Sequence, residues 1–196
     1  MTKSAEVSLT HPLGPIAVDD WLVGGQPTDG TRLELIWGYP VVSPPPGGAH
    51  RCVAEKLLVA MRSALRAADR DDLTVLRAVP IRISAPLRIA VIPDVIVTSG
   101  SPRHVSCGAE DVLLAVDVWS RDNPRAERDT RMAAFAAARV PHLWIIDLTV
   151  GERVGFEALV LGESGYRRKV YAADGETVTA PGPVPVPIDT GQLAPR

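Results

Sequence analysis

Cysteine is scarce in this chain of 196 residues. Cys52 and Cys107 are the only two, and neither belongs to a Cys-x-x-Cys pair. This spacing excludes a zinc ribbon, and two cysteines alone do not indicate a disulfide framework. Reduced, buried thiols are typical of proteins in a reducing compartment. The cysteine content therefore predicts a cytoplasmic protein.

Long apolar runs are lacking too. No stretch approaches the roughly 18 apolar residues of a membrane span, and the first 13 residues contain no apolar core of a signal peptide. We therefore predict no membrane partner. The chain also lacks a P-loop and a Gly-x-Gly-x-x-Gly motif after a strand, which disfavours enzymes that use nucleotide cofactors.

An excess of positive charge is missing as well. The chain has 21 Lys and Arg residues against 23 Asp and Glu residues, for a formal net charge of −2. Strongly basic nucleic-acid-binding domains, with a pI above about 9, are therefore excluded. Basic residues do gather at 121–131 and 167–169. This clustering leaves room for a weak or transient contact with DNA.

What the chain does contain is the composition of one folded domain. Hydrophobic residues make up 46% and charged residues 22%, which are values typical of globular proteins. Apolar residues at spacings of three and four predict helices over 50–68 and 125–139. Strands are predicted over 33–37, 41–43, 73–83, 89–98, 112–118 and 143–147, with a hairpin over 156–161 and 166–171. This order predicts an α/β (α+β) fold, a mixed sheet flanked by two main helices with extra hairpins.

An aspartate within an apolar strand is the most informative feature. Asp117 interrupts the apolar run over 112–118, and carboxylates are seldom fully buried unless they are paired or bind a metal. Asp94 follows Pro93 in the strand segment over 89–98, which precedes this run. Two interpretations stay open. The two carboxylates share a hard cation such as Mg²⁺ or Mn²⁺, or Asp117 forms a buried ion pair with Arg131 or Arg121.

The first interpretation points to metal-assisted hydrolysis of a phosphodiester. A bound cation polarises the phosphoryl oxygen and lowers the pKa of a bound water. Arg131, on the following helix, would stabilise the charge of the transition state. Glu127 lies four residues earlier, on the same helical face. This hypothesis requires Asp94 and Asp117 to share one cation at an open cleft, and it fails if arginine saturates Asp117.

Several sequence blocks, taken together and in order, carry a family resemblance. The blocks are 33–46, 93–95, 117–120, 131–135 and 140–147. Together they resemble the Uma-type restriction endonuclease family, which belongs to the PD-(D/E)xK nuclease superfamily. The resemblance implies a restriction-endonuclease-like fold.

The resemblance also implies site residues. The family pattern has a strand aspartate, a strand glutamate and a lysine that has moved onto the next helix. Asp94 matches the aspartate, Asp117 stands at the glutamate position and Arg131 stands at the lysine position. Glu34 matches an acidic residue of an upstream strand, and His50 stands where the family often has histidine. We therefore expect Asp94, Asp117, Arg131 and Glu34 as catalytic residues, with Asp94 and Asp117 as metal ligands.

Two of these matches change the chemistry. Asp117 is one methylene shorter than glutamate, and Arg131 cannot lose its proton to act as a base. The expected function is a metal-dependent endonuclease that hydrolyses DNA phosphodiester bonds with Mg²⁺ (or Mn²⁺), impaired by these substitutions. The alternative is a catalytically degenerate nuclease-fold protein that acts as a binding or interaction module.

The chain is expected to divide into three parts. These are an N-terminal extension over 1–30, a restriction-endonuclease-like domain over 31–175 and a proline-rich C-terminal tail over 176–196. The tail is expected to be extended and partly mobile. A homodimer that uses this tail as a contact arm is a third reading of the chain.

Overall fold

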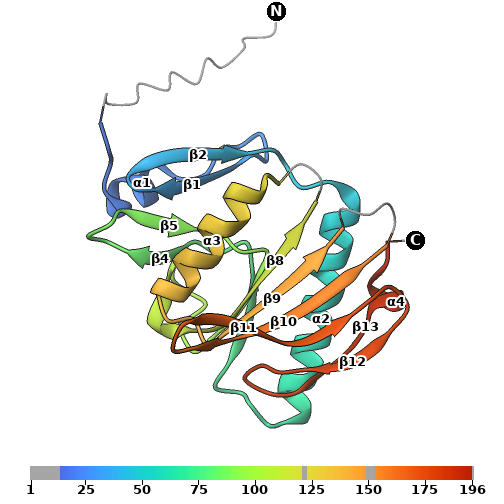
Figure 1. The fold of residues 1–196 in the computed structure, drawn as a ribbon. Coiled ribbons are helices and arrows are strands. Elements are labelled where there is room, and N and C mark those ends of the chain that lie inside the picture. Colours follow the sequence, from blue (N-terminus) through green and yellow to red (C-terminus); the bar gives the residue numbers. More distant parts are fainter. Residues whose placement is uncertain (1–13, 121–122, 149–152, 196) are drawn as a thin grey trace, which may run out of the picture.

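The computed structural model describes residues 14–120, 123–148 and 153–195, which form a mixed α+β fold (Figure 1). Its helices are α1 (Val18–Gly24), α2 (Gly48–Ala67), the 3₁₀ turn η1 (Ala109–Asp111), α3 (Arg125–Ala137) and α4 (Thr190–Leu193). Its first strands are β1 (Arg32–Ile36), β2 (Tyr39–Ser43), β3 (Thr74–Arg77), β4 (Ile81–Ser84), β5 (Ile89–Val91), β6 (Val95–Thr98) and β7 (Cys107–Gly108). The later strands are β8 (Val112–Trp119), β9 (His142–Asp147), β10 (Gly155–Gly162), β11 (Gly165–Ala172), β12 (Thr177–Ala180) and β13 (Val186–Asp189). The predicted mixed sheet with two main helices is confirmed.

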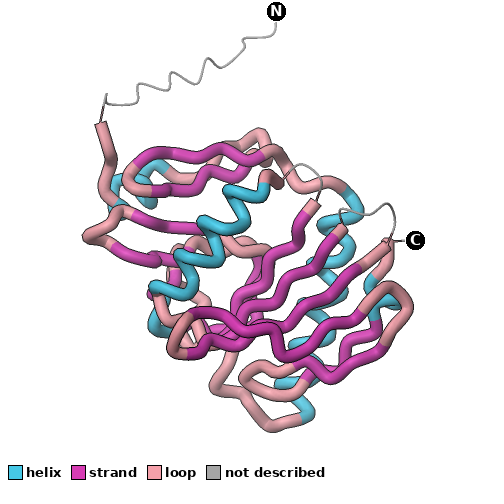
Figure 2. The backbone as a smooth tube through the Cα atoms, in the orientation of Figure 1, coloured by secondary structure: helices cyan, strands magenta, loops and turns pink. Residues whose placement is uncertain are grey.

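The central sheet has six strands in the order β11-β10-β9-β8-β6-β3. β8 and β9 pair in parallel, while their outer neighbours pair in antiparallel fashion. Parallel neighbours need a crossover connection, and α3 provides it by crossing in front of the strands in Figure 2. A second sheet has the order β2-β1-β5-β4-β7, and β12 and β13 form a separate hairpin.

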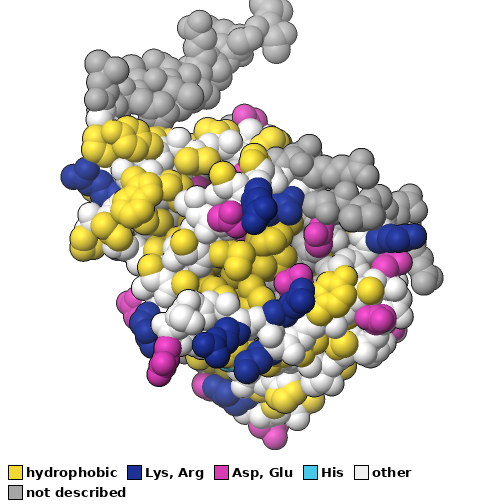
Figure 3. Space-filling model, in the orientation of Figure 1, with side chains coloured by type: hydrophobic (Ala, Val, Ile, Leu, Met, Phe, Trp, Pro, Cys, Tyr) yellow, Lys and Arg dark blue, Asp and Glu magenta, His cyan; other side chains and the backbone are white. Residues whose placement is uncertain are grey.

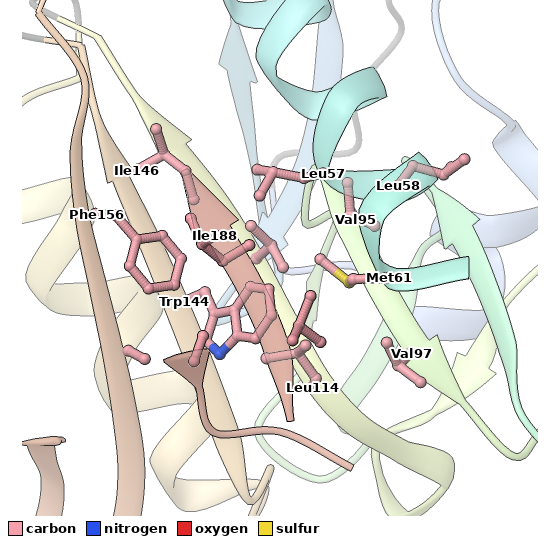
Figure 4. Close-up of a cluster of buried hydrophobic side chains, with 14 of the residues drawn as sticks. Leu57, Leu58, Met61, Val95, Val97, Leu114, Trp144, Ile146, Phe156 and Ile188 are labelled. Atoms are coloured by element: carbon pink, nitrogen blue, oxygen red, sulfur yellow. The ribbon is translucent and has the colours of Figure 1, made fainter. Parts of the chain in front are cut away.

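The main core lies between α2 and one face of the six-stranded sheet (Figure 4). Leu57 and Met61 of α2 pack in the same cluster as Val95 and Leu114 of the sheet. This follows from the spacing of the apolar residues in α2, which puts them on one helical face. The opposite sheet face packs against α3, where Phe135 is fully buried.

The β1–β2 hairpin carries one site residue and turns tightly. Ile36 pairs with Tyr39, so the turn consists of Trp37 and Gly38. Both have a positive φ, of 55° and 82°, as a tight two-residue hairpin turn requires. A Cβ on Gly38 would also lie only 2.5 Å from the Cβ of Pro15. The turn joins β1 and β2, which correspond to the strands predicted over 33–37 and 41–43.

Two predicted strands each divide into two. The expected strand over 89–98 is β5 and β6, which lie in different sheets. Pro93 has no N–H to donate to a sheet ladder, which explains the break. The expected strand over 73–83 divides likewise into β3 and β4, with Ala78 at φ 48° and Pro80 between them. The first break matters for function because it places Asp94 at the junction of the two sheets.

The expectation of an extended, mobile tail is wrong. β12, β13 and α4 fold back against α2, with Val186, Ile188 and Leu193 buried in the main core. The carbonyl of Pro181 accepts a hydrogen bond from Trp144 Nε1 at 2.8 Å, and Lys56 Nζ donates to the carbonyl of Ala194 at 2.7 Å. The prolines alternate with apolar residues, so one side of the segment is apolar and packs. The boundaries at residues 30 and 175 stay predictions, and residues 1–13 lie outside the described residues.

Candidate active site

Four side chains from four places in the fold meet in one cleft. Glu34 comes from β1, Asp94 from the junction before β6, Asp117 from β8 and Arg131 from α3. Each is at most 6% exposed. All four line the same cleft, which has a volume of about 610 Å³. The structure therefore brings together every residue that the sequence singled out for the site.

Arg131 lies at the centre of this group. Its Nε and Nη2 donate to the two carboxylate oxygens of Asp117 at 2.8 and 2.7 Å. Its Nη1 donates to both carboxylate oxygens of Glu34. Nη2 also reaches the carbonyl of Ile92 at 3.4 Å. A guanidinium has five N–H donors, so these contacts give every one of them an acceptor.

Charges around Arg131 keep it protonated. Burial alone would lower the pKa of Arg131, but the carboxylates of Asp117 and Glu34 outweigh burial and raise this pKa well above its usual value. Burial is also the largest influence on Asp117 and raises its pKa, while Arg131 acts in the opposite direction. The buried pair between Asp117 and Arg131 was one of the two interpretations of the sequence. Arg121, the other partner considered, lies outside the described residues.

Asp94 has partners of its own. Its Oδ1 accepts from Arg32 Nη2 and lies beside His50 Nε2, both at 2.8 Å. Its Oδ2 accepts from the backbone N–H of Val118 at 2.7 Å. Burial would raise the pKa of Asp94, but the hydrogen bond from His50 and the charge of Arg32 outweigh burial and lower this pKa to about 2. Asp94 is therefore ionised at neutral pH.

Two helices begin at the rim of the cleft. Gly47 directly precedes α2, and Ala49 and His50 lie in its first turn. Asn123 and Pro124 directly precede α3, and all five residues line the cleft. Neither helix has a side chain that caps its first turn. The first backbone N–H groups of a helix have no partner within the helix, and they carry partial positive charge. The rim therefore favours a negatively charged group.

Arg128 completes the rim on the α3 side. It donates to the carbonyls of Asn123 and Ser120 at 3.0 and 2.9 Å and lies 5.0 Å over the ring of Trp119. Glu127, one residue earlier, also lines the cleft, and burial raises its pKa. Figure 3 shows basic and acidic side chains interspersed on the face that carries α3, without a continuous basic patch. This mixture agrees with the near-balanced charge of the chain.

The family model described as "Uma2: Putative restriction endonuclease" matches residues 21–189. The chain belongs to the Uma2 family. A solved structure of a "putative nuclease belonging to DUF820" from Anabaena variabilis is similar to it, with 15% identity and a TM-score of 0.65 over 91% of this chain and 97% of the other. At this identity the likeness shows the fold alone. Comparison with curated proteins finds no match.

The restriction-endonuclease description of the Uma2 family implies a divalent cation, so the carboxylates can be tested for one. Both oxygens of Glu34, of Asp94 and of Asp117 already accept N–H groups. Within the described residues, no group of three or more His, Cys, Asp or Glu side chains is arranged to hold a metal ion. The donor atoms are of the right kind for Mg²⁺, but their arrangement around Arg131 does not fit it. The metal-ligand roles of Asp94 and Asp117 stay a prediction, and the occupation of both Asp117 oxygens by Arg131 argues against it.

Sequence reasoning on this Uma2 chain left one contact residue unnamed and gave two others little weight. Arg32 was not named, although it stands two residues before Glu34 on one strand and hence on the same face. His50 is predicted only as a position where the family often has histidine, and in the structure it contacts Asp94. Arg128 counted only as a member of a basic cluster, and nothing in the sequence indicates its stacking on Trp119.

In the part of the chain that the structure describes, no helix has the length and apolar character needed to cross a membrane.

Proposed function

We propose that this Uma2 protein binds the phosphodiester backbone of DNA in the cleft, and that it binds DNA better than it cleaves it. The observation that carries the proposal is the rim, where two uncapped helix starts meet Arg32, His50 and Arg128 around one opening. Backbone N–H groups at helix starts together with arginine forks are the usual means of holding phosphate. The family's description as restriction endonucleases supports DNA as the partner.

The charges of the cleft make this binding weak or transient. Among the described residues, four carboxylates and three guanidinium groups line it. Arg131 is fully occupied by Asp117, Glu34 and the carbonyl of Ile92, and Arg32 pairs with Asp94. Few cations remain for phosphate, and affinity for DNA rests mainly on phosphate neutralisation. The small net charge of the chain favours the same conclusion.

Hydrolysis by a divalent ion is the second candidate. In that case Asp94 and Asp117 would hold Mg²⁺ (or Mn²⁺), Arg131 would stabilise the charge of the transition state and Glu34 would support the site. The hard oxygen donors gathered in one cleft favour it. The contacts of Arg131 argue against it, because cleavage would require Asp117 to leave the guanidinium that now holds both of its oxygens.

A cytoplasmic location and a homodimer also remain proposals.

One experiment separates binding from cleavage. Fluorescence anisotropy with a labelled duplex at low salt measures binding, and nicking of supercoiled plasmid in Mg²⁺ or Mn²⁺ measures cleavage. We expect the wild type to bind DNA and to nick plasmid no faster than Asp94→Ala or Asp117→Ala. Metal-dependent nicking that both substitutions abolish would make hydrolysis the function. An absence of duplex binding at low salt would refute the binding proposal.

A further inference from the structure

We infer that the guanidinium of Arg131 is the resident cation of this site and that it excludes a divalent metal ion from the carboxylates. The inference goes beyond DNA binding, because it concerns the carboxylate cluster alone. It stands on the contacts among Arg131, Asp117 and Glu34. It would hold equally for a protein that binds no DNA.

The first argument is geometric. Arg131 faces Asp117 with two parallel N–H donors, the fork-to-fork arrangement that gives arginine–carboxylate pairs their specificity. The same side chain covers both oxygens of Glu34. Mg²⁺ demands an octahedron of oxygens at about 2.0–2.1 Å. An ion placed among these oxygens at that distance would displace the N–H groups that now occupy them.

The second argument is electrostatic. Glu34, Asp117 and Arg131 are each at most 6% exposed, so solvent screens their charges little. A buried guanidinium beside a buried divalent ion would repel it strongly at contact distance. One cation among two carboxylates is therefore accommodated, and a second is not.

The third argument is the supply of donors. All five N–H groups of Arg131 have acceptors, since the carbonyl of Ile92 takes the one that the carboxylates leave. Lysine has only three donors on one atom and cannot match two carboxylates in this way. An arginine at this position holds the cluster closed, and a lysine would leave carboxylate oxygens open.

The test measures Mn²⁺ binding to the full chain without DNA, by the loss of the free Mn²⁺ signal in electron paramagnetic resonance. The variants are Arg131→Met, Arg131→Lys and the control Arg125→Met, which removes a highly exposed arginine of the same helix. We expect negligible binding by wild type and Arg125→Met. Arg131→Met should bind one Mn²⁺ with a gain of about tenfold or more, the scale on which groups that contact metal ligands alter metal affinity. Adding Asp117→Asn to Arg131→Met should remove the gain.

Folding is checked by circular dichroism. Arg131→Met leaves two carboxylates buried without a cation, so folding of this variant only in the presence of Mn²⁺ would also support the inference. Arg131→Lys keeps a positive charge and should show an intermediate gain. The inference is overturned if wild type binds one Mn²⁺ that Asp117→Asn removes, or if folded Arg131 variants gain no Mn²⁺ binding. Failure of DNA binding leaves these results unaffected, so the two proposals fail separately.

Discussion

Arg131 and Asp117 form a two-point pair, with Nε and Nη2 of the guanidinium at 2.8 and 2.7 Å from the two carboxylate oxygens. The pair joins α3 to β8 of the six-stranded sheet. Through Glu34 of β1, the same guanidinium also joins α3 to the five-stranded sheet. Arg131 therefore links both sheets from one helix, and the site is part of what holds the fold together.

Removal of one partner should reveal this link. We expect Asp117→Ala to lower the free energy of unfolding by about 3–5 kcal/mol, because it leaves a buried arginine without its main counter-charge. Urea denaturation at pH 7 measures the change. The control Asp129→Ala breaks an exposed pair with Arg125 at 3.7 Å and should cost less than about 0.5 kcal/mol. Similar effects of the two substitutions would show that the buried pair contributes little.

Local sequence patterns predicted most of the elements. The helices over 50–68 and 125–139 correspond to α2 and α3, because apolar spacing reports which face a helix buries. The strand over 112–118 corresponds to β8, since an apolar run signals burial on both faces. What the patterns did not predict is which sheet each strand joins. Strand pairing depends on contacts between distant residues, and those have no local signature.

Like the fold, the site could be predicted from the sequence only in part. Asp117 stood out because a carboxylate in an apolar strand needs a partner, and Arg131 lies only 14 residues later. The contact between Arg131 and Glu34 spans 97 residues, so no local pattern indicates it, and only the family resemblance assigned both residues to one site. The pairing of Asp94 with Arg32 and His50 depends on the break at Pro93, which the sequence presented as the interior of one strand.

Protonation of the Asp94 carboxylate in acid should lower the free energy of unfolding. Its pKa is about 2 in the folded protein against an ordinary value of 3.8, so its contribution is complete above about pH 4 and is lost as the pH falls towards 2. The shift corresponds to about 2 kcal/mol. Unfolding free energies of wild type and Asp94→Asn, measured by urea between pH 7 and pH 3, should converge as the pH falls. The raised pKa of Asp117 acts in the opposite direction, but it is present in both proteins. A difference in unfolding free energy between the two proteins that stays constant with pH would contradict the lowered pKa of Asp94.

Arg128 should contribute to DNA affinity through phosphate alone. It lines the cleft and stacks on Trp119, and no acidic side chain pairs with it among the ion pairs of the described residues. We expect Arg128→Ala to weaken binding to all DNA sequences alike and to reduce the salt slope by about one unit. Anisotropy titrations at several salt concentrations measure this slope. The control Arg70→Ala, in the loop after α2, should change neither quantity, and an unchanged slope for Arg128→Ala would exclude its contact with phosphate.

The C-terminal hairpin should behave as part of the core. Ile188 in β13 is 1% exposed and belongs to the same cluster as Leu57 and Met61 of α2. Ile188→Ala removes three buried carbon atoms and should lower the free energy of unfolding by about 2–5 kcal/mol. Thr179→Ala, on the exposed side of the neighbouring β12, should stay within about 0.5 kcal/mol of wild type. Urea denaturation of both variants decides the matter. If Ile188→Ala were as harmless as Thr179→Ala, residues 177–193 would be dispensable for stability. A large loss only for Ile188→Ala would show that the hairpin is part of the core it shares with α2, and a truncation near residue 181 should then destabilise the domain.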